Sequence, residues 1–263
     1  MREAERSRTQ LSGEASANLE RFLKPAGTYD LVRLGRNHDG GYLVDRRDVL
    51  ASTALISLGI NDDWSFENDF LTMNPVPLDA YDGSVSPRIY ARRIAKFALA
   101  GDRRQLTSSV NALRTYRRFF QKDRRHHPLM VGFAGAEGST TLREIFDDRS
   151  ETSVFLKIDI EGWEYRLLDD LVKYVDRLSS LAIEFHDYDL HVPRVRDFIA
   201  ATNLRVAHVH ANNWSPISDM RTPLALEVTL SSSNPVSPEP APLPHPLDQP
   251  NNATRPEISI HFD

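Results

Sequence analysis

The segment FLKIDIEGWEYRLLDDL, residues 155–171, sets carboxylates directly after an apolar run that is typical of a buried strand. The run ends at Asp159, and Glu161 and Glu164 follow within five residues. An unpaired buried carboxylate is costly, so a core strand can end in acids where its end borders a ligand pocket. The alternative is that Asp159 caps the next helix, whose dipole would favour Glu161 and Glu164.

Polar residues also end the other apolar runs of the chain. In an open α/β sheet, ligands bind outside the carboxyl ends of the strands, where the strand order reverses. We therefore expect these strand ends to meet around one cleft. The principal residues are Gly59 at the end of 53–60, Asp82 after 76–81, Asp159 at the end of 153–160, Glu184 and His186 in 178–186, and His210, Asn212 and Asn213 in 204–213.

Two histidines are candidate general bases at these strand ends. Imidazole titrates near neutrality, and His186 stands beside Glu184 and Asp187. His210 is the second candidate, and the alternative for each is a histidine satisfied by neighbouring backbone. Asp159, Glu184 and His186 could instead hold Mg²⁺ or Mn²⁺, which would bind a hydroxylated acceptor and lower its pKa.

Strands that alternate with helices predict a doubly wound α/β sheet. The predicted helices include one over 163–175, which has a single apolar stripe, and one over 191–203. No helical pattern separates the last two strands, so they should form an antiparallel hairpin. The predicted strands are 53–60, 76–81, 129–135, 153–160, 178–186, 204–213 and 224–232.

Three regions follow from the pattern. Residues 1–50 form an N-terminal extension, with a peripheral helix up to residue 24 and a β-hairpin around Asn37–Gly41. Residues 51–232 form the α/β domain. Residues 233–263 hold eight of the sixteen prolines and predict an extended tail outside the core, whose last residues, EISIHFD, could return as an edge strand.

A basic insert lies at 86–127, where twelve Lys and Arg face two Asp although the whole chain has a net charge of −5. The pattern is helical, and its length predicts either a lid whose arginines meet an anionic acceptor or a solvated pair of surface helices. Nucleic-acid binding is disfavoured, because Tyr116, Phe119 and Phe120 are spaced as core anchors and the chain is acidic.

Composition excludes several kinds of chemistry. The chain has no cysteine, so it has no disulfide, thiolate metal site or thiol nucleophile. No window approaches 18 consecutive apolar residues, and the first ten residues lack a secretory signal pattern, so we expect no membrane span and a soluble, cytoplasmic protein.

The sequence resembles FkbM-type methyltransferases, a family of class I enzymes that use S-adenosylmethionine. The resemblance begins with KIDIEGWEYRLL and continues, in the family's order, through LGRNHDGGYLV, LISLGINDDWSFE, AIEFH and HVHANN, over roughly residues 30–230. It implies a class I methyltransferase Rossmann-like sheet, mostly parallel, with an antiparallel final hairpin.

The resemblance also implies roles for single residues. The cofactor would lie over the first, second and fourth strands, close to Asp159. Gly59 would let the backbone approach its methionine part, and Asp82, with Asp79 as a rival, would bind both ribose hydroxyls. Glu137 is the candidate for the adenine edge.

One departure from the usual glycine-rich loop favours a methyl donor. Gly59 stands alone before Ile60 and Asn61, whereas loops that cradle phosphates need more glycine. Asp62 and Asp63 would repel a diphosphate but not a sulfonium cation.

We therefore expect an S-adenosylmethionine-dependent O-methyltransferase for a small molecule or glycan, including an anionic one. The alternatives are a metal-dependent glycosyltransferase with a nucleotide-sugar at Asp159 and Glu161, and a binder without catalysis. The sequence predicts neither the acceptor nor the oligomeric state.

Overall fold

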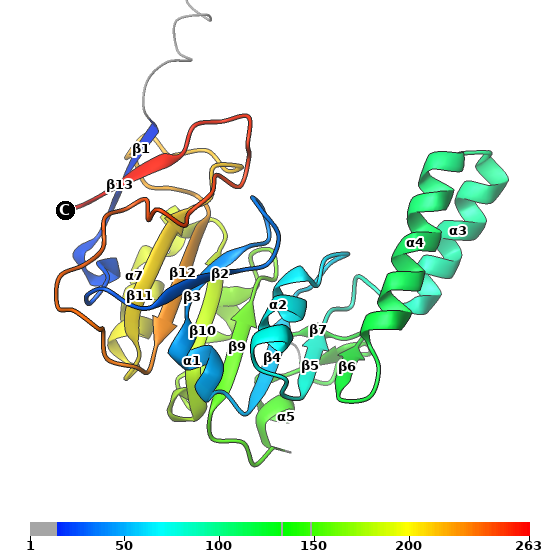
Figure 1. The fold of residues 1–263 in the computed structure, drawn as a ribbon, viewed down its shortest axis with the longest axis horizontal. Helices are drawn as coiled ribbons and strands as arrows, with labels where there is room; N and C mark the ends of the chain where they lie inside the picture. Colours follow the sequence, from blue (N-terminus) through cyan, green and yellow to red (C-terminus); the bar gives the residue numbers. More distant parts are fainter. Residues whose placement is uncertain (1–14, 133, 148) are drawn as a thin grey trace, which may run out of the picture.

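The computed structural model describes residues 15–132, 134–147 and 149–263, and its centre is a seven-stranded sheet (Figure 1). The strand order is β11-β12-β10-β9-β4-β5-β6. All neighbours from β10 to β6 are parallel, and β12 is antiparallel to β10 and β11. The strands are β4 (Ala54–Leu58), β5 (Leu78–Tyr81), β6 (Arg124–His127), β9 (Val154–Ile158), β10 (Leu178–Phe185), β11 (Arg205–Ala211) and β12 (Leu226–Ser231).

This topology confirms the predicted fold class, a mostly parallel, doubly wound class I methyltransferase-like sheet with an antiparallel final hairpin. The chain runs outward from β4 through β5 to β6, then returns to β9 on the other side of β4. The strand order therefore reverses between β4 and β9, which is where such folds bind ligands.

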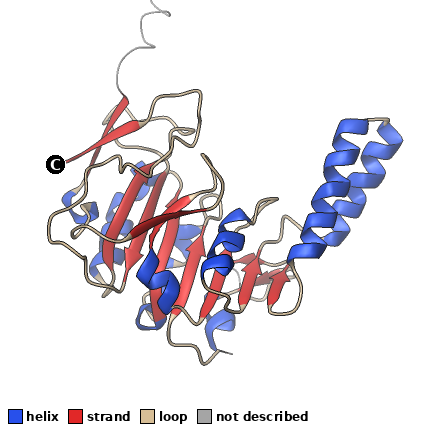
Figure 2. Ribbon diagram, viewed as in Figure 1, coloured by secondary structure: helices blue, strands red, loops and turns tan. Residues whose placement is uncertain are grey.

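Helices cover both faces of the sheet, so its central strands are buried on both sides (Figure 2). Ile56 and Leu156 pack in one core with α5 (Leu142–Asp147), α6 (Leu168–Leu171) and α7 (Tyr188–Ala200). Leu55 and Phe155 pack in the other with α1 (Arg46–Ala51) and α2 (Ser65–Met73). Burial on both faces explains why β4 and β9 are continuous apolar runs.

The third strand of the sheet is not the predicted one. Among the described residues of 129–135, only Met130–Val131 form a strand, β7, which pairs with β8 (Ser139–Thr140) in a separate small sheet. The third strand is β6, whose sequence is RRHH. An edge strand needs no apolar face when its polar side chains find partners, and Arg125 and His127 both bind Asp79.

In the N-terminal region, the predicted helix is wrong and the predicted hairpin is present. Residues 15–19 form β1 (Ala15–Leu19), followed by the 3₁₀ turn η1 (Arg21–Leu23), so the helix predicted up to residue 24 is wrong here; its first fourteen residues lie outside the described ranges. The predicted hairpin is present as β2 (Leu31–Leu34) and β3 (Tyr42–Asp45), with Gly40 at a φ of 85° in its turn.

The C-terminal region is extended as predicted but does not lie outside the core. Asn251 and Asn252 are buried, and Asp248 binds His208 of β11. The last strand, β13 (Ile258–Phe262), pairs with β1 instead of the edge of the central sheet. The prediction failed because the segment packs through polar side chains, which an apolar pattern does not reveal.

Two helical segments complete the fold. The helix predicted at 163–175 is broken into η2 (Glu164–Arg166), α6 and η3 (Val175–Arg177), although its apolar stripe is buried. The insert forms α3 (Pro87–Ala100) and α4 (Arg103–Phe119), a helical hairpin that projects from the body (Figure 1).

Within the described ranges, every helix is too short or too polar to cross a bilayer.

Candidate functional site

A cavity of about 670 Å³ lies at the carboxyl ends of β4, β5, β9 and β10. Gly59, Asp82, Asp159 and His186 all line it, so the structure brings together the four residues that the sequence predicted would share a cleft. The β2–β3 hairpin contributes Arg36, Asp39 and Gly40 to the same wall. The N-terminal extension is therefore part of the site.

Gly59 is required by the packing of two loops. It has a φ of 82°, and a Cβ atom there would lie 1.6 Å from the carbonyl oxygen of Asp159. The loops after β4 and β9 consequently touch through backbone, which only glycine permits. This is a different reason from the predicted one, which was room for the methionine part of a cofactor.

Asp82 holds the loop after β4 in place. One carboxylate oxygen accepts hydrogen bonds from the backbone N–H of Ile60 and Asn61 at 3.0 and 2.8 Å, and the other accepts from Ser84 at 2.7 Å. Burial acts to raise the pKa of Asp82, but the hydrogen bonds from Ser84, Asn61 and Ile60 hold it below its usual range. Asp82 therefore stays ionised at the cavity wall.

Asp79, the rival of Asp82, has a structural role. It is 1% exposed, does not line the cavity, and binds Arg125, His127 and Arg149. Burial opposes ionisation, but the hydrogen bonds from His127 and Arg149 lower its pKa to about 2. This cluster joins β5 to the edge strand β6 and to the segment after α5.

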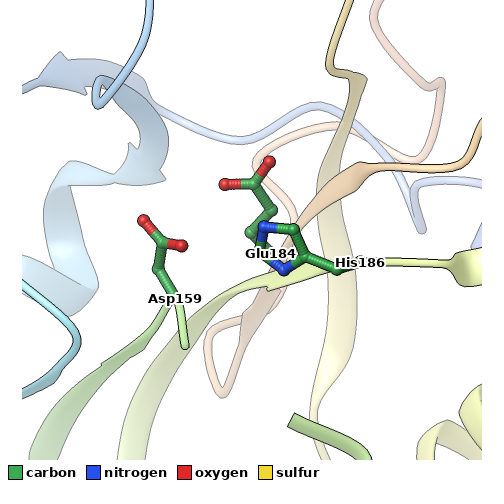
Figure 3. Close-up of side chains that lie close together, drawn as sticks. All are labelled: Asp159, Glu184 and His186. Carbon is green, nitrogen blue, oxygen red and sulfur yellow. The ribbon is translucent and has the colours of Figure 1, made fainter. Parts of the chain in front are cut away.

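At the carboxyl ends of β9 and β10, the side chains of Asp159, Glu184 and His186 converge (Figure 3). One possible ligand atom from each lies within 4.8 Å of the others. The Tyr42 hydroxyl donates to Asp159 Oδ2 at 2.9 Å and also lies 3.3 Å from Glu184 Oε2. Asn212 Nδ2 donates to Glu184 Oε1 at 2.7 Å. Sequence reasoning had given no role to Tyr42.

The environment of Glu184 favours its neutral form. It is 6% exposed, and burial together with the charges of Asp159 and Glu227 raises its pKa to about 8. A positive charge placed between Asp159 and Glu184 would therefore replace a proton.

His186 is oriented by the loop after β9. Its Nδ1 lies 3.0 Å from Glu164 Oε1, which also accepts from the backbone N–H of Ile160 and Gly162. Its Nε2 lies 3.6 Å from the exposed Glu161. Burial acts to lower the pKa of His186, but the Glu164 bond and the nearby carboxylates raise it to about 9. Glu164 therefore organises the loop and the imidazole together.

Lys157 is a buried cation that sequence reasoning missed. Its side chain is 6% exposed, and Nζ donates to the Gly59 carbonyl at 3.1 Å and lies 3.5 Å from Asp159 Oδ2. Burial opposes its charge, but Asp159, Glu67 and Glu184 outweigh that effect and raise its pKa. The signal was a lysine two residues before Asp159 in an apolar strand, which places both side chains on one face.

Glu67 is the second residue that sequence reasoning missed. It comes from α2, is 1% exposed and lines the cavity. Among the described residues, no group makes a hydrogen bond to its Oε1. Burial raises the pKa of Glu67, against the charge of Lys157. A buried carboxylate oxygen without a donor marks a place where a ligand cation or donor would be stabilised.

Three parts of the predicted site, two residues and one segment, do not line the cavity. His210 is buried away from it, with Nδ1 3.0 Å from Glu227 and Nε2 3.1 Å from Glu257, so both ring nitrogens are occupied and its predicted role as a second base is left without support. Glu137 is exposed and does not line the cavity, which leaves the adenine-edge role without support.

The basic insert is the third part of the predicted site that does not line the cavity. No residue from 86–127 lines the cavity, so its arginines form no lid over a bound anion. Tyr90 and Arg93 instead bind the two carboxylate oxygens of Asp62, both at 2.6 Å. These bonds fix the base of the hairpin to the loop after β4.

Comparisons with known proteins find similarity only among solved structures. No family model and no curated protein matches the chain. An rRNA methylase from Streptococcus thermophilus is 12% identical, with a TM-score of 0.34, over 72% of this chain and 94% of that one. The Methanococcus jannaschii fibrillarin pre-rRNA processing protein is 11% identical, with a TM-score of 0.36, over 70% and 68%.

A precorrin-6y C5,15-methyltransferase from Geobacter metallireducens is 12% identical, with a TM-score of 0.35, over 72% of this chain and 87% of that one. Scores this low say nothing about family, substrate or mechanism. The fold assignment rests on strand order and direction, and membership of the FkbM-type family stays a prediction.

Proposed function

We propose that this protein is an S-adenosylmethionine-dependent methyltransferase that acts on a hydroxyl of a small molecule or glycan. The observation that carries the proposal is the place of the cavity, at the carboxyl ends of the strands on both sides of the β4–β9 switch point. Its volume of about 670 Å³ falls in the range of small-molecule sites. Methyl transfer requires the donor and the acceptor to be aligned in one enclosed space.

The charge of the cavity supports a cationic donor. Seven carboxyl groups line it, against three cationic groups, Arg36, Lys157 and His186, and Arg36 pairs with Asp39 and Asp63. The carboxyl groups are those of Asp39, Asp63, Glu67, Asp82, Asp159, Glu161 and Glu184. This excess of carboxylates suits a sulfonium and an ammonium group and opposes a diphosphate.

Four residues would hold the donor. Asp82 stays ionised at the cavity wall, where it would accept a hydrogen bond from a ribose hydroxyl. Glu67 would receive the α-ammonium group on its unpaired oxygen. Leu129 and Met130 offer an apolar wall for the adenine ring.

His186 is the proposed base for the acceptor hydroxyl. With a pKa of about 9 it is protonated at neutral pH, so it can take a proton only after a positive charge nearby lowers that pKa. The sulfonium of the donor brings such a charge. Glu164 then holds Nδ1 and leaves Nε2 as the free nitrogen.

A divalent ion fits Asp159, Glu184 and His186 as an alternative to the base role, because a metal on Nε2 would leave His186 no nitrogen to take the proton. Its presence stays a prediction. Asp159, Glu184 and His186 supply two carboxylates and one imidazole, and the bond from Glu164 to His186 is the support that metal-bound histidines usually have. Bound there, Mg²⁺ or Mn²⁺ would lower the pKa of the acceptor hydroxyl.

The glycosyltransferase alternative receives less support. It requires Asp159 and Glu161 to share a metal and a diphosphate. The Glu161 side chain is 83% exposed and is not one of the three residues whose ligand atoms converge.

Calorimetric titration tests the proposal. We expect micromolar binding of S-adenosylhomocysteine, and weakening of that binding by about 1–3 kcal/mol in Asp82→Ala, which loses a carboxylate that orders the loop. Binding of a UDP-sugar with Mn²⁺ instead would establish the alternative, and binding of neither ligand would leave a non-catalytic protein.

A second titration tests whether Glu67 binds the α-ammonium group of the donor. In Glu67→Gln we expect S-adenosylhomocysteine to bind about tenfold more weakly, whereas 5′-methylthioadenosine, which lacks the amino-acid part, should bind as in the wild type. Glu161→Gln is the matched control, because it removes one negative charge from the same cavity. Equal losses for both ligands in Glu67→Gln would refute the assignment.

A further inference from the structure

The helical hairpin of residues 87–119, here called the arm, has no use in the proposed chemistry. It projects from the body (Figure 1), and no residue of it lines the cavity. Its only carboxylate is Asp102, which caps α4 by accepting from the Gln105 N–H. Its nine basic residues are Arg88, Arg92, Arg93, Lys96, Arg103, Arg104, Arg114, Arg117 and Arg118.

The basic side chains occupy the outer faces of the arm. Tyr90, Ser109, Tyr116 and Phe119 are the buried residues along its inner face. Arg88, Arg92 and Lys96 follow at four-residue steps, so they form one row that repeats every ~6 Å. Arg114, Arg117 and Arg118 project together from the last two turns of α4. Within the described ranges, Arg93 alone among the nine forms an ion pair.

The composition of these faces points to a polyanion. Leu99 and Val110 are the large apolar side chains exposed on the arm, which is too few for a protein interface or a membrane-inserted face. Two copies of the arm would repel each other through their like charges. A long anionic chain would neutralise the row on α3 and the cluster on α4 together.

The base of the arm lies beside the cavity. α3 begins three residues after Ser84, which lines the cavity. Tyr90 and Arg93 bind Asp62, whose neighbours Asn61 and Asp63 line it as well. A chain bound along the arm can therefore reach the cavity mouth.

The cavity discriminates between kinds of polyanion. In a nucleic acid, phosphates are bonded directly to every ribose, so the reacting sugar would bring them toward Asp63, Asp159 and Glu161. In an acidic glycan, a neutral sugar can enter while acidic units stay outside. Trp214 lines the cavity, is 54% exposed and offers a sugar ring the face opposite Arg255, whereas every aromatic ring of the arm is buried or half-buried and cannot stack on bases.

We propose that the arm binds the acidic units of an anionic glycan and guides a neutral unit of the same chain into the cavity. This inference rests on the proposed function, because it assigns the acceptor of that reaction. It also reverses the expected geometry of the insert: the arginines bind the acceptor outside the cavity and do not close over it.

Binding of polygalacturonate to the full chain, measured at low and high salt, tests the inference. Neutral dextran serves as the uncharged polymer and a short RNA duplex as the competing polyanion. We expect saturable binding of polygalacturonate that weakens with salt, and no binding of dextran. The triple variant Arg114→Glu, Arg117→Glu, Arg118→Glu should lower the affinity at least about tenfold.

The matched control is Arg143→Glu, Arg194→Glu, Arg196→Glu, which makes the same change in net charge at exposed positions off the arm. It should bind polygalacturonate like the wild type. Both variants should bind S-adenosylhomocysteine normally, which shows that the cavity is folded.

Tighter binding of the RNA duplex than of polygalacturonate, or equal losses in the two triple variants, would overturn the inference while leaving the proposed function intact. Failure of the wild type to bind S-adenosylhomocysteine would instead remove the proposed function, whatever the glycan result.

Discussion

Two clusters in this protein have nearly the same composition and opposite environments. Asp159, Glu184 and His186 meet at the cavity, and Glu227, Glu257 and His210 meet between β11, β12 and the C-terminal segment. Each has two carboxylates and one histidine, and Glu184 and Glu227 are directly paired residues of β10 and β12. Glu184 and Glu227 therefore place the two clusters side by side on neighbouring strands of one sheet.

The difference is whether protein groups bind both ring nitrogens of the histidine. His210 is 2% exposed with both nitrogens bonded, and Asn251 donates to the second oxygen of Glu227 at 2.7 Å. His186 has one nitrogen held by Glu164, and the other faces the exposed Glu161 at the cavity. The same residue types form a closed cluster where the chain covers them and an open one where it does not.

The largest expected effect is on catalysis at the open cluster. His186→Asn keeps a donor for Glu164 but removes the base, so methyl transfer should fall by about 10²- to 10⁴-fold. Transfer is measured with labelled donor and an acceptor found by screening. Donor affinity should stay near the wild-type value, while the melting temperature should fall because the buried Glu164 loses its cation. A rate loss below tenfold would remove His186 from the chemistry.

The closed cluster should respond in stability instead. His210→Gln leaves the buried Glu227 and the half-buried Glu257 without their cation, which should lower the free energy of unfolding by about 3 kcal/mol. Chemical denaturation measures this loss, with the exposed His261→Gln as the control. The donor affinity of the folded variant should be unchanged; a selective loss of donor affinity would show that the two clusters act as one.

The pH dependence of stability sharpens the same contrast. Burial acts to lower the pKa of His210, but Glu227, Glu257 and Asp248 raise it well above its usual value. A raised native pKa gives stabilisation that is complete below the unfolded-state pKa of about 6.5 and is lost as the pH rises through the native pKa.

The free energy of unfolding should therefore decline above this pH by up to about 1.4 kcal/mol per pH unit from this group. Denaturation curves at a series of pH values should show the decline in the wild type and in His261→Gln. His210→Gln should lack this contribution, and an identical slope in all three proteins would show that His210 is not the titrating group.

The smallest effect concerns the segment that closes the second cluster. Asn251→Ala removes the donor to Glu227 and should cost about 1 kcal/mol of stability, with no change in donor binding. Thermal melting and calorimetry on the same sample check both parts. A large loss of donor binding would mean that the C-terminal segment shapes the cavity as well.

Much of the fold was predictable because its signals are local. The strands β4, β9 and β10 are apolar runs that end in polar residues, and parallel strands bring such ends to one edge of the sheet. The edge strand β6 and the segment 233–256 were not predictable in this way, because both pack through polar side chains whose partners are distant in sequence.

By itself, the sequence determined which residues stand at the strand ends, and hence that Gly59, Asp82, Asp159 and His186 would share a cleft. Only the tertiary structure decided which histidine keeps a ring nitrogen that faces the cavity. His210 is closed by Glu257, 47 residues away, whereas Tyr42, 117 residues from Asp159, joins the open cluster. The periodicity of a chain fixes the direction of a side chain, but whether its bonds are already satisfied depends on which distant segment packs against it.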